Sequence, residues 1–158
     1  MKIFSIYIWT IAFLGLLAGA AIFILFVLLP SWQAMQPEAF MEWVKDFGGR
    51  IGFVMLPMEM IPLLLSIYIF FRTRKSNDAG KNLWLWVNVC NVIVLVMLFA
   101  YFIPINLSFI NKTMLPENVP AELKRWQMIH TARTIFIVLS LVLAIAAVSK
   151  AVKKHDPA

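Results

Sequence analysis

Three ionisable side chains occur inside long apolar segments of this sequence: Glu59 in the second segment, and His130 and Arg133 in the fourth. Charged groups inside a membrane are costly, so they normally face a bundle interior and pair with one another. An imidazole can move a proton near neutral pH, and a guanidinium can hold an oxygen anion. These residues therefore indicate either acid–base chemistry on an oxygen-bearing molecule or a buried ion pair that holds helices in register.

The spacing of these residues predicts that they meet. Trp126, His130 and Arg133 stand at positions i, i+4 and i+7 and form one helical stripe, with Thr134 alongside as a further candidate for substrate binding. At a rise of ~1.5 Å per residue, Glu59 lies about 12 Å into its segment, His130 about 6 Å and Arg133 about 10 Å. Both segments enter from the same side, so we expect Glu59 to be the counter-ion of Arg133.

The composition places these residues in a membrane protein. Of the 158 residues, 62% are hydrophobic, well above the roughly 45–50% of a soluble domain. Apolar runs long enough to span a bilayer occupy residues 6–29, 51–71, 83–103 and 126–148. Backbone groups in lipid must satisfy their own hydrogen bonds, so these runs should be helices. We expect an all-α fold: a single domain over 1–158 that forms an up-down-up-down four-helix bundle.

The first segment has two alternative interpretations, as a signal peptide or as a retained span. Lys2 and Ala18-Gly19-Ala20 resemble a signal peptide and its cleavage site, but the apolar run continues to Leu29. The apolar part of a signal peptide is only about 7–15 residues long, so we expect a retained span. Gly15 and Gly19 form a GxxxG pair that lets another helix approach closely. Packing inside the bundle is the favoured role, and a homo-oligomer contact is the alternative.

The distribution of basic residues predicts the orientation. One side of the bundle should carry Lys2, Arg72, Arg74, Lys75, Lys81, Lys150, Lys153 and Lys154, whereas the opposite loops hold fewer basic and more acidic residues. The positive-inside rule then places both termini in the cytoplasm of a multi-pass protein of the inner (cytoplasmic) membrane. Anionic lipid at the basic side accounts for the net charge of +6 without a nucleic-acid partner.

Residues 37–48, between the first two spans, predict a short amphipathic interfacial helix. Pro37 can start this helix and Gly48-Gly49 can end it. Its apolar face carries Phe40, Trp43, Val44 and Phe47. Such a helix floats on the membrane, with Trp32 and Trp43 at headgroup level, or forms a lid over the bundle.

The second and third spans contain residues that break the apolar pattern. Pro57 and Pro62 bracket Glu59, so we expect a kinked helix that lines a cavity there. Asn88 and Asn91 should form hydrogen bonds between helices. Cys90 is the only cysteine, which excludes an internal disulfide, a CxxC redox site and therefore thiol oxidoreductases.

Two motifs resemble the anthrone oxygenase-like family of small four-span membrane proteins. Phe102-Ile-Pro-Ile-Asn106 is followed by a polar loop and by Trp126-x-x-x-His130-x-x-Arg133-Thr134, and the similarity is concentrated over 102–134. Gly15, Gly19 and Pro30 agree more weakly. Glu59 between two prolines has no counterpart in this pattern.

The resemblance implies a four-helix membrane bundle whose fungal members oxidise anthrones to anthraquinones with molecular oxygen and no evident cofactor. Most bacterial members have no assigned activity. By the resemblance, Asn106, Trp126, His130 and Arg133 would be the polar site residues. His130 would act as the base, Arg133 would stabilise the oxyanion, and aromatic and methionine side chains such as Met55 would hold the flat ring.

Other classes of function remain as alternatives. A non-enzymatic protein could bind a lipid or hydrophobic small molecule, with Glu59, His130 and Arg133 as a structural cluster. A metal site would lack a third strong ligand beside Glu59 and His130, and Arg133 opposes a cation, so we expect no metal. A haem with two histidine ligands is excluded because His155 lies in the tail. A transporter is disfavoured because the four spans show no internal repeat.

Overall fold

In the computed structural model, which describes residues 3–76 and 80–155, the chain is helical and no described residue lies in a strand. Four of the described helical segments are long and apolar enough to cross a membrane. They consist of α1 (Ile3–Phe23), η1 (Ile24–Leu28) and α2 (Leu29–Gln33); α3 (Pro37–Lys75); α4 (Lys81–Met97), η2 (Leu98–Phe102) and α5 (Ile103–Ile110); and η3 (Pro116–Asn118) with α6 (Val119–His155). Each contains one predicted span and extends beyond it.

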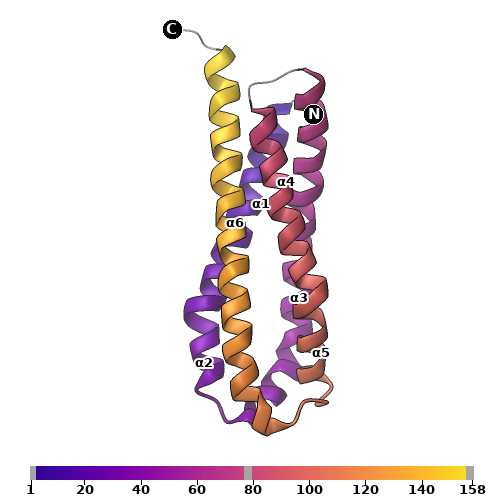
Figure 1. The fold of residues 1–158 in the computed structure, drawn as a ribbon, viewed down its shortest axis with the longest axis vertical. Helices are drawn as coiled ribbons and strands as arrows, with labels where there is room; N and C mark the ends of the chain where they lie inside the picture. The colour runs from indigo at the N-terminus through magenta and orange to yellow at the C-terminus, as the bar shows by residue number, and fades with distance from the viewer. Residues whose placement is uncertain (1–2, 77–79, 156–158) are drawn as a thin grey trace.

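The four segments lie lengthwise beside one another, with both ends of the chain at the same end of the molecule (Figure 1). The connections from α2 to α3 and from α5 to α6 lie at the opposite end. α6 packs against α4 and α1, and α3 packs against α1, α4 and α5. The apolar segments therefore bury one face on each other and leave many large hydrophobic side chains on the outside.

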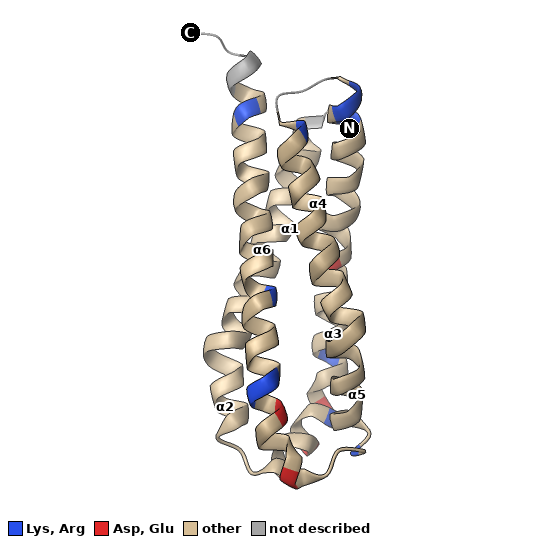
Figure 2. Ribbon diagram, viewed as in Figure 1, with Lys and Arg blue, Asp and Glu red and all other residues tan. Residues whose placement is uncertain are grey.

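The two ends of the molecule differ in charge (Figure 2). The end near the termini carries Arg72, Arg74, Lys75, Lys81 and Lys150, and no acidic residue among those that the structure describes there. The opposite end carries charges of both signs. Lys2 and the side chains of Lys153 and Lys154, which we also assigned to the basic end, lie outside the described residues.

The predicted interfacial helix over 37–48 is wrong as a separate element. α3 runs without interruption from Pro37 to Lys75, through Gly48-Gly49 and through both prolines that flank Glu59. A glycine ends a helix when it adopts a left-handed conformation, and no described glycine has a positive φ. Burial of Phe40 and Val44 against the bundle explains why the helix tolerates two glycines, which cost only about 0.5–1 kcal/mol each.

The first and third segments each contain one π-helical turn, η1 and η2. Pro30 is the second residue after the end of η1, and Pro104 is the second residue after the end of η2. A proline ring crowds the carbonyl four residues earlier, which here belongs to Phe26 and Ala100. Both carbonyls lie inside the π turns, so the widened turns relieve this clash.

Asn88 and Asn91 form the interhelical hydrogen bonds that we predicted. Asn88 Nδ2 donates to the Ser66 carbonyl at 3.2 Å, and Ser66 Oγ donates to Asn88 Oδ1 at 3.0 Å. Asn91 Nδ2 donates to Ser66 Oγ at 3.3 Å, and Ser140 Oγ donates to Asn91 Oδ1 at 2.8 Å. This polar layer joins α3, α4 and α6 between the candidate site and the basic end.

The expected packing of Gly15 and Gly19 inside the bundle is wrong. A Cβ placed on either glycine would meet no described atom within 4 Å. The close approach that a GxxxG pair permits is therefore not used between the helices that the structure describes.

Candidate functional site

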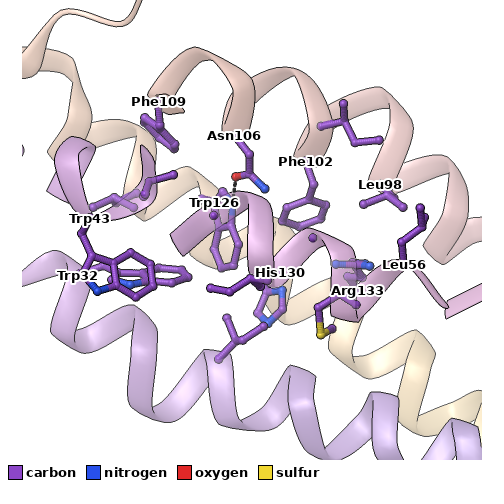
Figure 3. Close-up of a pocket in the computed structure, with 18 of the residues that line it drawn as sticks. Trp32, Trp43, Leu56, Leu98, Phe102, Asn106, Phe109, Trp126, His130 and Arg133 are labelled. Carbon is purple, nitrogen blue, oxygen red and sulfur yellow. Dashed lines mark hydrogen bonds between the residues drawn. The ribbon is translucent and has the colours of Figure 1, made fainter. Parts of the chain in front are cut away.

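A cavity of about 320 Å³ lies in the half of the bundle away from the termini. Residues of η1, α2, α3, η2, α5 and α6 line it, and its aromatic lining residues are Trp32, Phe40, Trp43, Phe102, Phe109 and Trp126. Figure 3 shows Trp32 and Trp43 at one end, and Arg133 with Leu56 at the other. The volume is at the lower end of the range of small-molecule sites, and the aromatic lining suits a flat molecule.

Glu59 and Arg133 meet at the charged end of this cavity, as the helix positions predict. Arg133 Nη2 donates a hydrogen bond to Glu59 Oε2, and both side chains are buried. The Arg133 guanidinium carbon also lies 4.9 Å from the centre of the Phe102 ring. The pair joins α3 to α6, and the aromatic face adds a cation–π contact.

His130 lies beside this pair but does not bond to it. Its Nε2 lies 3.0 Å from the backbone carbonyl of Ala21, one turn before η1. Its ring stacks on Trp126 at 4.6 Å between centroids and meets the edge of Phe102 at 6.0 Å. A carbonyl can only accept, so Nε2 carries the proton and, in a neutral ring, Nδ1 carries the lone pair.

Four buried polar atoms of the cavity-lining residues have no hydrogen-bond partner among the described residues. They are Trp32 Nε1, Glu59 Oε1, His130 Nδ1 and Arg133 Nε. Buried polar atoms almost always have a partner, so a concentration of exceptions around one cavity requires an explanation. The set contains two donors and two acceptors, which matches a ligand that carries oxygen or hydroxyl groups.

Asn106 and Trp126 hold each other at the wall of the cavity. Trp126 Nε1 donates to Asn106 Oδ1 at 3.3 Å, which joins α6 to α5 (Figure 3). This bond fixes the indole ring on which His130 stacks. Asn106 therefore positions the imidazole through Trp126.

Of the two remaining candidates for substrate binding, Met55 and Thr134, one lines the cavity and the other does not. Met55 lines the cavity, as expected. Thr134 is not among the residues that line the described cavity. Its hydroxyl instead donates to the His130 carbonyl in its own helix at 2.8 Å. A threonine adjacent to an arginine on the helix lies about 100° away from it, which is enough to turn its side chain out of the site.

The aromatic end of the cavity was not predictable from the local sequence pattern. We expected Trp32 and Trp43 at lipid headgroups, but Trp32 is buried and packs against Phe40, Trp43 and Trp126 with centroids 5.3–6.0 Å apart. Phe40 also meets Phe109 edge-on at 5.1 Å. The apolar face of residues 37–48 therefore closes the cavity, which corresponds to the lid alternative.

Both π turns contribute to the site. η1 supplies Ile24 to the lining, and η2 supplies Leu98 and Phe102. Single π turns inside α-helices are rare and often occur at functional sites. Pro30 and Pro104 are the sequence signal that could have located them.

Comparison with known proteins gives no functional assignment for this site. No protein-family model, no curated protein and no solved structure matches the chain. The resemblance to anthrone oxygenase-like proteins therefore depends on the two motifs alone, and the chemical reading of the site depends on the residues around the cavity.

Proposed function

We propose that this protein binds a flat, hydrophobic molecule with a phenolic or ketone oxygen and oxidises it with molecular oxygen, as the fungal members of the anthrone oxygenase-like family do. It would act as a multi-pass protein of the inner (cytoplasmic) membrane, with helices up-down-up-down and both termini in the cytoplasm. The basic end in Figure 2 supports this orientation through the positive-inside rule.

The observation that carries the proposal is that one cavity has both aromatic walls and buried polar atoms without a partner among the described residues. Aromatic rings on α2, α3, η2, α5 and α6 can stack on a planar ligand. Glu59, His130 and Arg133, at the same cavity, each retain one buried polar atom without a partner among the described residues. A ligand oxygen near these side chains would supply the missing partners.

In the proposed reaction, His130 acts as the base and Arg133 stabilises the negative charge that forms. His130 Nδ1 removes a proton from the acidic carbon of an anthrone, and the electron pair moves to the ketone oxygen, which Arg133 stabilises. Molecular oxygen adds to the carbon, the peroxide anion takes the proton back from His130, and the resulting hydroperoxide loses water to leave a second carbonyl. One oxygen molecule is consumed and one water is released for each anthrone. General base catalysis of this kind typically contributes about 10²–10⁴-fold.

Turnover of an anthrone by the purified protein tests the proposal. We expect His130→Gln to lower the rate of quinone formation and oxygen uptake by about 10²-fold or more. Thr131→Ala is the matched control, because Thr131 is exposed on the same helix and, among the described residues, its hydroxyl bonds only to the Gln127 carbonyl. A folded His130→Gln protein with full turnover would refute the role of His130 as the base.

A non-enzymatic binding protein is the second candidate, and the Glu59–Arg133 contact favours it. A buried pair between α3 and α6 can hold helices in register without taking part in chemistry. Under this alternative, mass spectrometry of the purified protein detects a bound lipid or aromatic molecule, and no anthrone is consumed. Turnover that depends on His130 excludes it.

A further inference from the structure

The residues that line the cavity differ in exposure according to their helix. All lining residues on η1, α2 and α6 are buried. On α3, by contrast, Gly52 and Leu56 line the cavity and are also exposed on the outside, with Leu56 44% exposed. Ile103 and Asn106 on α5 are partly exposed as well. The cavity therefore opens sideways, between α3 and the η2–α5 segment.

The end of the bundle near the α2–α3 connection is closed by comparison. Phe40 and Phe109 are 2% and 1% exposed and meet edge-on there. Trp32 is buried behind them, so aromatic rings separate this end of the cavity from the outside.

The outer surface around the lateral opening is apolar. Phe53 and Val54, beside Gly52 on α3, are 81% and 58% exposed. Phe99 and Leu107 are exposed on the opposite segment. The sequence between Arg50 and Glu59 carries no charge. In a bilayer, such a surface contacts acyl chains, so the opening lies at the edge of the hydrocarbon layer, just beyond the exposed Arg50.

Two glycines one helical turn apart shape the α3 side of the opening. A Cβ on Gly48 would lie 3.0 Å from Val44 Cγ1 and 3.5 Å from Ile110 Cδ1, so this glycine permits close contact with α5. A Cβ on Gly52 would meet no described atom within 4 Å, although Gly52 lines the cavity. Open space therefore adjoins the Gly52 backbone at the wall of the cavity.

We propose that the gap at Gly52 is a lateral portal through which a membrane-dissolved aromatic molecule enters the cavity from the bilayer. The identity of the ligand rests on the proposed function, whereas the route rests on the exposure pattern. A larger side chain at Gly52 blocks the route without touching His130, Glu59 or Arg133. The portal restricts substrates to flat molecules that partition into lipid.

The test compares two glycines of the same helix in phosphatidylcholine vesicles. The probe is a coloured dihydroxyanthraquinone added to the membrane, and its binding is followed by quenching of tryptophan fluorescence. Gly52→Leu should slow binding at least tenfold. Gly49→Leu is the matched control, since a Cβ at Gly49 also meets no described atom within 4 Å but Gly49 does not line the cavity. Both changes raise helix propensity, so neither should unfold α3.

A second pair of variants keeps the test decisive if Gly52→Leu fails to fold. In a Cys90→Ala background, Gly52→Cys should react with a bilayer-soluble maleimide, and prebound probe should protect it at least tenfold better than Gly49→Cys. Equal binding rates in Gly52→Leu and Gly49→Leu, or equal protection of the two cysteines, would overturn the portal while the proposed function stands. No probe binding by the unmodified protein would overturn both.

Discussion

At the residue scale, the Glu59–Arg133 ion pair could be predicted from the sequence, whereas the hydrogen bond of His130 could not. Glu59 and Arg133 meet because the helix rise brings them to one level, and sequence alone predicted this contact. The bond from His130 to the Ala21 carbonyl was not predictable, because every residue carries a backbone acceptor. Helix depth is readable from counting residues, whereas the acceptor that an imidazole selects depends on the packing of a third helix.

A double-mutant cycle separates a structural role of the pair from a catalytic one. Glu59→Leu or Arg133→Met alone should destabilise the protein by about 3–5 kcal/mol, because each leaves an unpaired buried charge. The double variant should be more stable than either single variant and should have no turnover. Thermal unfolding in detergent and anthrone oxidation are measured on the same samples.

The control for this cycle combines Arg133→Met with Ser149→Ala, about 24 Å further along α6. Distant changes should add within about 0.3–0.5 kcal/mol. Additive destabilisation in the Glu59–Arg133 cycle itself would contradict the buried pair.

At the element scale, prolines affect the backbone differently in different helices. Pro30 and Pro104 each follow a π turn, whereas α3 remains α-helical through Pro57 and Pro62. The prolines around Glu59, where we predict a kink, therefore do not interrupt the helix, and π turns that we did not predict shape the cavity. A proline reveals which carbonyl is crowded, but packing determines whether the turn widens.

Pro104→Ala should impair the site without unfolding the helix. An alanine supplies the missing N–H group and removes the clash with the Ala100 carbonyl, so η2 can return to α-helical bonding. This change rotates Leu98 and Phe102 relative to the cavity, and misplacement of this kind can lower turnover by about 10²-fold. Anthrone oxidation and thermal unfolding together measure the effect, and stability should hold or rise.

Pro57→Ala is the control for this prediction, because Pro57 lies in α3 where the helix is already α-helical. It should leave turnover within a few fold of the unmodified protein. If Pro104→Ala and Pro57→Ala behave alike, the π turn does not position the site.

At the scale of the whole molecule, the four apolar segments were the most predictable feature. Long apolar runs in a bilayer have few stable alternatives to helices, so composition and length suffice to locate them. The separate helix over 37–48 was mispredicted because amphipathic spacing is the same for a membrane float and for a helix end that covers a cavity. Its apolar face packs on aromatic residues from α2 and α5, which no local pattern reveals.

The charge asymmetry of the two ends leads to a direct test of orientation. In a Cys90→Ala background, Ser76→Cys places an exposed thiol at the basic end and Glu117→Cys places one at the opposite end. In right-side-out vesicles, an impermeant maleimide should label Glu117→Cys directly and Ser76→Cys only after permeabilisation, because basic residues remain on the cytoplasmic side. The reverse pattern would place the aromatic end of the cavity toward the cytoplasm, and ligand would then be drawn from the inner leaflet.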